Sequence, residues 1–123
     1  MVKYPRLLSR LVSLFFAAGS GAAVVQTDSG PVSGSTSDGV AAYLAIPYAA
    51  PPLGGLRWKP PADPLPWSGV RDATRRGPQC PQPGEVPPNG MSEDCLTLNV
   101  WTPAATSTAR LPVMVFIHGG SWM

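Results

Sequence analysis

The sequence predicts a mostly β chain with one apolar strand of the kind that α/β proteins cover with helices. Proline and glycine number 16 and 13, and both disfavour helix interiors. No segment after residue 23 has the apolar periodicity of a helix. The apolar run at 113–117, VMVFI, is typical of a strand buried on both faces, and in α/β proteins helices cover such a strand.

The N-terminus has the pattern of a secretory signal peptide. Lys3, Arg6 and Arg10 form a positive region, which is followed by a short apolar region at 11–18 and by small residues at 19–23. The apolar run is too short to span a bilayer comfortably, so no stable membrane span is expected. An anchoring or amphipathic N-terminal helix is the alternative interpretation.

Cleavage is expected after Ala23, with Ala22 and Ser20 as alternative sites, so that residues 1–23 form the leader and 24–123 the mature chain. The predicted location is secreted or periplasmic. The full chain carries nine basic and seven acidic residues, a net charge of +2. Without the three basic residues of the leader, six basic and seven acidic residues remain, which gives a net charge of −1. Because no basic stripe remains, nucleic acid is not an expected partner.

Short strands are expected early in the mature chain. Strand-like pieces at 24–27 and 31–35 flank the turn residues 28–30, DSG, and therefore predict a hairpin. A third strand is expected at 40–46. Twelve prolines between Pro47 and Pro88 make the following stretch loop-like, because proline fixes φ and removes a backbone donor.

Apolar anchors are expected to hold this loop to the sheet, and they are Leu56, Trp58, Trp67 and Val70. After the loop, residues 96–101 alternate apolar and polar or aromatic side chains, which predicts a strand with a period of two. A polar turn at 102–112 then leads to the buried strand expected at 113–117.

Four blocks resemble the type-B carboxylesterase family: SEDCLTLNVWTP at 92–103, IPYAAPPLGGLRWKPP at 46–61, PWSGVRDAT at 66–74 and PVMVFIHGGSW at 112–122. They occur in the family's order and cover nearly all of residues 30–123. The resemblance implies an α/β-hydrolase fold, with this chain as its N-terminal portion, ending before the nucleophile elbow. It also implies a small-molecule carboxylic ester as substrate, a serine-nucleophile mechanism and no cofactor.

The resemblance implies that HGGSW forms an oxyanion-hole loop. The early donors would be the N–H groups of Gly120 and Ser121, and Gly119 would shape the turn. The family often has a third glycine where Ser121 stands. His118 is expected to position this loop through a hydrogen bond. An ordinary Gly-Gly turn after a strand is the alternative reading of these residues.

The remaining catalytic groups are not expected within this chain. A nucleophile elbow has the pattern Gly-x-Ser-x-Gly, which the sequence lacks, and His118 is its only histidine. The chain alone is therefore predicted to be inactive. Since there is no His or Cys cluster, no metal site is expected either.

Cys80 and Cys95 are expected to form a disulfide, because an exported chain with an even number of cysteines favours pairing, and the resemblance implies the same bridge. Two free thiols are the alternative. The loop between them has no aromatic residue, so the resemblance is to general carboxylesterases and not to cholinesterases. The resemblance also implies a buried or semi-buried ion pair between Arg57 and Glu93, and a solvated surface pair is the alternative.

Two other functional classes remain open from the sequence. A non-catalytic, esterase-like interaction module would share the same blocks. An independent small β-protein would have to cover the run at 113–117 by itself, and the composition argues against that.

Overall fold

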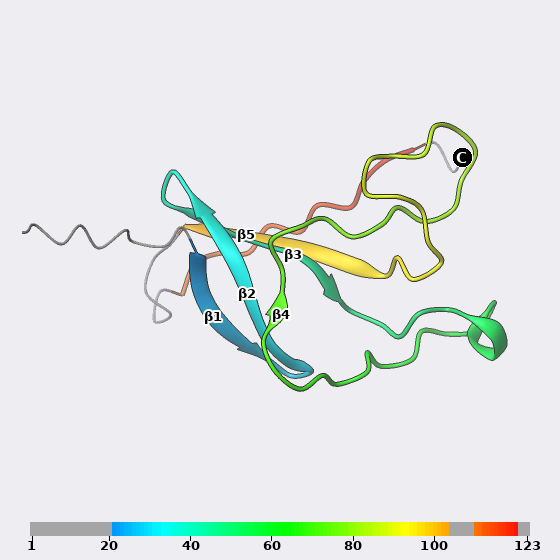
Figure 1. Cartoon of the computed structure of the whole chain (residues 1–123), viewed down its shortest axis with the longest axis horizontal. Helices are drawn as coiled ribbons and strands as arrows, with labels where there is room; N and C mark the ends of the chain where they lie inside the picture. Colours follow the sequence, from blue (N-terminus) through cyan, green and yellow to red (C-terminus); the bar gives the residue numbers. More distant parts are fainter. Residues whose placement is uncertain (1–20, 104–109, 121–123) are drawn as a thin grey trace, which may run out of the picture.

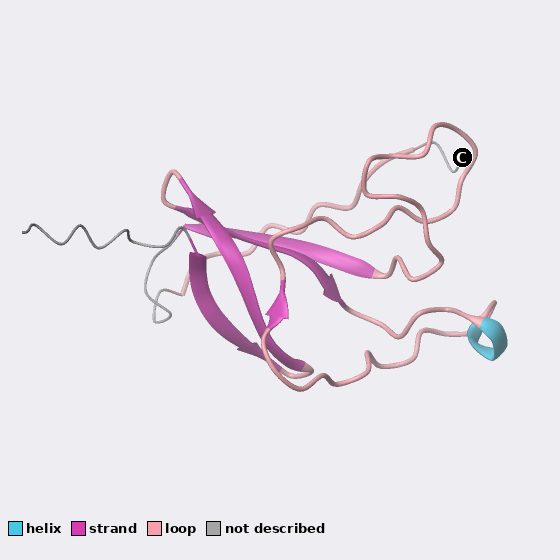
Figure 2. Ribbon diagram, viewed as in Figure 1, coloured by secondary structure: helices cyan, strands magenta, loops and turns pink. Residues whose placement is uncertain are grey.

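The computed structural model describes residues 21–103 and 110–120. The elements follow one another as β1 (Gly21–Thr27), β2 (Gly30–Ser37), β3 (Val40–Pro47), the 3-10 helix η1 (Gly54–Leu56), β4 (Arg71–Asp72) and β5 (Thr97–Pro103). The strands form one sheet in the order β1-β2-β3-β5, and β4 pairs with β2 off this path (Figure 1). Among the described residues η1 is the only helical element, as Figure 2 shows, so the mostly β expectation is confirmed.

The turn between β2 and β3 follows from its sequence. Ser37 lies opposite Val40, which leaves Asp38 and Gly39 as a two-residue loop. Their φ angles are 50° and 76°. Two positive φ angles match the type I′ turn, whose twist fits the twist of the strands it joins, and Asp-Gly is a preferred pair for it. This local chemistry fixes the register of the antiparallel pair.

The predicted first hairpin is present, and Trp67 fastens the long loop to it. The backbone N–H of Trp67 donates to the carbonyl oxygen of Ser29 at 2.9 Å, and its indole Nε1–H donates to that of Pro31, also at 2.9 Å. The indole lies so close to Gly30 that a Cβ at this glycine would be 2.6 Å from Nε1. Glycine at position 30 thus leaves room for the anchor.

Strand β4 is a two-residue parallel pairing that the sequence did not predict. Arg71 lies opposite Val32, and the following residue Asp72 lies opposite Ser33. Ala73 then donates its N–H to the carbonyl oxygen of Ser33 at 2.8 Å and accepts from the N–H of Leu44 at 2.8 Å. This residue therefore connects β2 and β3 through backbone hydrogen bonds alone.

The core is small and lies on the sheet around the middle of β2 and β3. Its buried residues, each no more than 6% exposed, are Val32, Ala41, Tyr43 and Ala73, and the partly buried Ala22, Ile46 and Trp67 pack against them. Two of the four buried residues are alanines, whose small side chains fit where the strands approach closely. Glycine also serves this packing, since a Cβ at Gly34 would lie 2.1 Å from the carbonyl oxygen of Ala42.

Strand β5 confirms the strand expected after the loop and pairs antiparallel with β3. A bulge in β3 leaves Ala45 with φ of 56°, and its N–H donates to Oδ1 of Asn99 at 3.0 Å. Leu98 and Val100, on the alternating apolar positions, are 41% and 40% exposed. Leu98 lies opposite Ile46 and Val100 lies opposite Tyr43, so both side chains are on the core face of the sheet and only partly covered there.

The strand expected at 113–117 is not present, and this prediction is wrong for the structure. These residues form an irregular segment, drawn in orange to red in Figure 1, and the side chains are between 79% and 93% exposed. A strand needs a neighbouring strand for its backbone groups. Within residues 21–103 and 110–120 none pairs with this segment, so its apolar character alone does not make it a strand.

Of the expected loop anchors, only Trp67 contacts the core. Trp58 is 102% exposed with φ of 60°, while Leu56 and Val70 are 38% and 56% exposed. Three of the four anchor predictions are therefore wrong. In the described part of the chain, no helix is long and apolar enough to cross a membrane.

Candidate functional site

The glycine turn predicted as an oxyanion loop follows the exposed segment. Gly119 and Gly120 are both exposed, and no atom lies within 4 Å of the Cβ that a side chain at Gly119 would add. Gly120 has φ of 151°, a value that residues with a Cβ rarely adopt. Ser121, the third predicted residue of the loop, lies outside the described residues. The two described glycines therefore leave their backbone open to an approaching group.

His118 lies directly before this turn and contacts it. Its Nδ1 is 2.8 Å from the carbonyl oxygen of Gly119, so the tautomer protonated at Nδ1 donates a hydrogen bond there. A hydrogen bond to the glycine turn is the kind of contact by which His118 was expected to position this loop. The side chain is exposed, and within the described residues no acidic side chain bonds to the ring.

His118 and residues far from it in the sequence line one hollow of about 530 Å³. It is lined by Gln79, Cys80, Pro81, Gln82 and His118. The chain thus brings the histidine of the glycine turn beside the disulfide, although 37 positions separate residues 118 and 81. Sequence reasoning missed the two glutamines, because nothing in a proline-rich loop signals which of its polar side chains will face a hollow.

The disulfide expected between Cys80 and Cys95 is formed, with the two Cα atoms 5.2 Å apart. The loop it closes is held further by backbone bonds across its base. Gln79 donates to the carbonyl oxygen of Gly90 at 3.0 Å and accepts from the N–H of Ser92 at 2.9 Å. Asn89 also donates its side-chain amide to the carbonyl oxygen of Gly77. The bridge therefore fixes the strand-like base of a loop whose tip is exposed.

Arg57 and Glu93 form an ion pair between Nη2 and Oε1, on the solvated surface. Their side chains are 55% and 41% exposed. The hydrogen bond to Glu93, and after it the charge of that carboxylate, raises the pKa of the Arg57 guanidinium. The pair connects the residue after η1 to the segment that precedes β5. Of the two arrangements left open by the sequence, the described one is the solvated pair.

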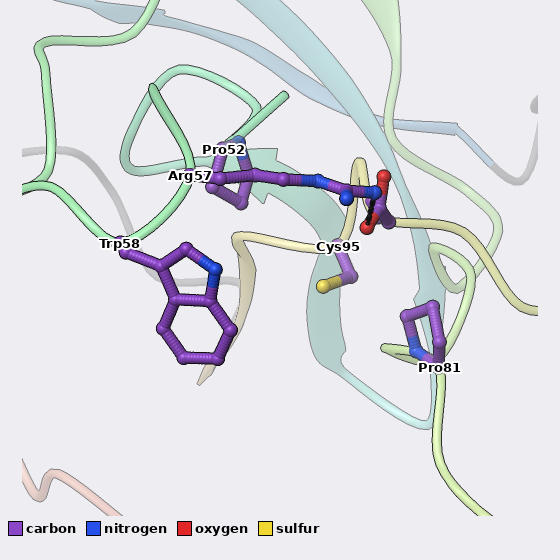
Figure 3. A pocket seen from close by; sticks show the side chains of 6 residues that line it. Pro52, Arg57, Trp58, Pro81 and Cys95 are labelled. Atoms are coloured by element: carbon purple, nitrogen blue, oxygen red, sulfur yellow. Dashed lines mark hydrogen bonds and ion pairs between the residues drawn. The ribbon is translucent and has the colours of Figure 1, made fainter. Parts of the chain in front are cut away.

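A second hollow, of about 280 Å³, surrounds this ion pair. Its lining residues are Pro52, Arg57, Trp58, Pro81, Glu93 and Cys95. Figure 3 shows Arg57 extended toward the carboxylate, with Trp58 and Pro81 on opposite sides of Cys95 in the view. Most of the lining is apolar, and its one ionic pair is already satisfied. Within residues 21–103 and 110–120 no group of three His, Cys, Asp or Glu residues could hold a metal ion.

The twisted sheet, the disulfide-closed loop and the terminal glycine turn define the N-terminal, mostly β part of an α/β-hydrolase fold. The model of the carboxylesterase family matches residues 21–123. The chain belongs to the carboxylesterase family.

Three hydrolases from three different organisms are similar to this chain over most of its length. Pyrethroid hydrolase Ces2a of Mus musculus is 47% identical over 120 residues, covering 82% of this chain and 22% of the relative. Fumonisin B1 esterase of Sphingopyxis macrogoltabida is 45% identical, with 80% of this chain and 19% of the relative covered. Para-nitrobenzyl esterase of Bacillus subtilis is 46% identical, with shares of 80% and 21%. The chain spans about a fifth of the length of these relatives.

Solved structures give the same result for the fold. A thermophilic PNB esterase superposes with a TM-score of 0.74 at 46% identity, covering 80% of this chain and 22% of that chain. EstA of Aspergillus niger superposes with a TM-score of 0.74 at 39% identity, with shares of 80% and 20%. The described sheet is therefore shared with these two structures, of which about a fifth is covered by this chain.

Proposed function

We propose that this chain is the N-terminal part of a secreted carboxylic ester hydrolase that uses a serine nucleophile, and that its role in catalysis is to supply the oxyanion-hole loop. The observation that carries the proposal is the family match, which extends through His118 and the glycine turn to residue 123. Membership of the family supports ester hydrolysis as the reaction. The serine mechanism and the part played by Gly119, Gly120 and Ser121 belong to the proposal.

The chemistry explains why such a turn is useful. When a nucleophile adds to an ester carbonyl, negative charge develops on the carbonyl oxygen. Preorganised N–H donors stabilise this charge, and removing one donor from a comparable hole lowers kcat by roughly 10²–10³. In this proposal the N–H groups of Gly120 and Ser121 donate to the oxyanion, while Gly119 gives the backbone its close approach.

The surrounding contacts have a supporting role. The hydrogen bond between His118 and Gly119 orients the start of the turn. The disulfide and the Arg57–Glu93 pair hold the neighbouring loop, which lies beside His118 at the larger hollow. None of these groups is proposed to transfer a proton or to attack the substrate, so the 123-residue chain alone is predicted to be inactive.

The first test measures hydrolysis of p-nitrophenyl acetate and p-nitrophenyl butyrate by the purified 123-residue chain. The expected rate equals that of a matched inert protein, because the proposal assigns the nucleophile and the general base to segments outside these residues. A rate well above this background that a serine-directed phosphonate abolishes contradicts the assignment of these roles to other segments.

The second test restores a complete enzyme. Residues 21–123 replace the corresponding N-terminal part of a para-nitrobenzyl esterase, and kcat and KM are measured. The chimera is expected to hydrolyse the ester. In the chimera, the substitution Ser121→Pro removes one N–H donor. It is expected to lower kcat by a factor of roughly 10²–10³, with little change in KM. Gly55→Ala, in the exposed η1, is the matched control and leaves both constants unchanged. Equal kcat values for the Ser121→Pro and control chimeras contradict the oxyanion role.

Secretion is the remaining part of the proposal. It is supported by the positive, apolar and small-residue regions of the N-terminus. Export of the full chain from a secretory host, followed by recovery of a shortened form outside the cytoplasm, is the expected outcome. A full-length chain retained inside the cell contradicts it.

A further inference from the structure

The sheet includes residues that the sequence assigns to the leader. Strand β1 begins at Gly21, which lies opposite Ser35 in the register with β2. Ala22 packs against the core cluster. The strand therefore uses the last three residues before position 24, and a chain that begins at Val24 lacks this end of β1.

Tyr43 gives these residues a specific contact. Its side chain is 6% exposed, and its hydroxyl donates to the carbonyl oxygen of Ala23 at 2.8 Å. A phenol that is buried this deeply needs a hydrogen-bond partner, because its polar end has been removed from water. Cleavage after Ala23 removes the acceptor together with the residue, whereas cleavage before Gly21 retains it.

The leader offers a suitable bond just before the strand. Signal peptidases cut after small residues that alternate in an Ala-x-Ala-like pattern. The bond between Ser20 and Gly21 is preceded by Ser20 at the first position and by Ala18 at the third. Sequence pattern alone allows this bond and the bonds after Ala22 and Ala23, and only the contacts of β1 separate the three. A cut after Ala22 would keep the Ala23 acceptor but would remove Ala22 from the core.

We propose that the leader is removed at the Ser20–Gly21 peptide bond, so that the mature chain starts at the first residue of β1. The proposal rests on the secretory part of the proposed function. A host signal peptidase adds one water across this bond, which leaves a carboxylate on Ser20 and a free amino group on Gly21. All residues of β1, the Gly21–Ser35 pairing and the acceptor of the Tyr43 hydroxyl then remain in the exported protein.

The full chain is expressed in a bacterial host with an active secretory pathway, and the first residue of the exported form is determined by N-terminal sequencing and intact mass. The expected first residue is Gly21. A first residue of Val24, or any other residue, overturns the assigned bond while leaving export in place. An unprocessed chain overturns both the assigned bond and the proposed secretion, so the two failures are distinguishable.

Two lysine substitutions sharpen the result, because a bulky charge beside the scissile bond blocks cleavage there. Ser20→Lys is expected to abolish the Gly21 start. Ala23→Lys is the matched control, since the Ala23 side chain is exposed and lies three residues beyond the proposed bond. It is expected to leave the Gly21 start unchanged. Unchanged processing of Ser20→Lys together with blocked processing of Ala23→Lys overturns the proposal and places the cut after Ala23.

Discussion

Strand β2 and the segment at 113–117 invert the usual relation between apolar composition and burial. β2 reads GPVSGSTS, with Val32 as its only large apolar residue, and yet Val32 is 1% exposed. The segment reads VMVFI, and its side chains are between 79% and 93% exposed. The difference lies in their neighbours. β2 pairs with β1, β3 and β4, whereas no described strand pairs with the segment.

This comparison shows that burial of a strand depends on partners more than on its own hydrophobicity. The small residues of β2 allow three strands to approach it closely, and the close approach removes water from Val32. The apolar segment would bury more area per residue, but apolar area stabilises only when another surface covers it. In family members the chain continues for about four times this length, and additional segments are available there.

The largest effect on stability is expected from Gly34→Ala, which adds a side chain where β2 and β3 approach each other closely. The new Cβ would lie 2.1 Å from the carbonyl oxygen of Ala42 and 2.8 Å from a ring carbon of Tyr43. Backbone must move to accept it, so the free energy of unfolding should fall by roughly 4 kcal/mol. Urea unfolding measures the change. Gly55→Ala, which meets no atom within 4 Å, is the control and should stay within about 0.5 kcal/mol of wild type.

Loss of the disulfide should be the next largest effect. In the double variant Cys80→Ser, Cys95→Ser, a loop with a sequence separation of 15 is no longer closed, which costs about 3 kcal/mol in the chain-entropy model. Amide exchange should rise most between residues 81 and 94, with the β2–β3 pairing affected less. Equal loss of protection in the loop and in β2 would show that the two regions unfold as one unit.

A matched pair of valines tests the comparison directly. Val32→Ala removes two methyl groups from a buried site and should lower the free energy of unfolding by about 2 kcal/mol. Val115→Ala makes the same chemical change at a residue that is 79% exposed, and should shift it by less than about 0.5 kcal/mol. If the two variants lose similar stability, residues 113–117 are buried in solution, and the contrast drawn with β2 does not hold.

The smallest effect concerns Asp72 in β4. Hydrogen bonds from Thr74, the side chain first and the backbone N–H second, lower the pKa of this carboxyl, and the charge of Arg75 adds to the shift. A folded pKa below the unfolded one contributes stability above the unfolded pKa, and that stability is lost as pH falls through the folded pKa. The difference in urea midpoint between wild type and Asp72→Asn should therefore be small at neutral pH and vanish in acid. Parallel pH profiles contradict this origin.

How much the sequence revealed depended on the range of each interaction. The hairpin strands, the strand before the polar turn and the disulfide were all predictable, because each has a signal within a few residues or a single possible partner. The pairing of β4 with β2 was not, since two residues inside a proline-rich loop carry no periodicity. The exposure of Trp58 was also missed, because a large apolar side chain does not indicate whether a surface will meet it.

The candidate site likewise has some features that the sequence determined and others that only the tertiary structure decided. The sequence by itself determined the local features: glycines where φ is positive, the Asp38–Gly39 turn, and the His-Gly-Gly pattern inside the region that the carboxylesterase family matches. These depend on steric limits within one or two residues. Only the tertiary structure decided that His118 lies beside the disulfide loop, that Tyr43 donates to Ala23, and that Val32 is buried while Val115 is exposed. Such outcomes depend on segments far apart in the chain, and burial is a property of the surfaces that meet.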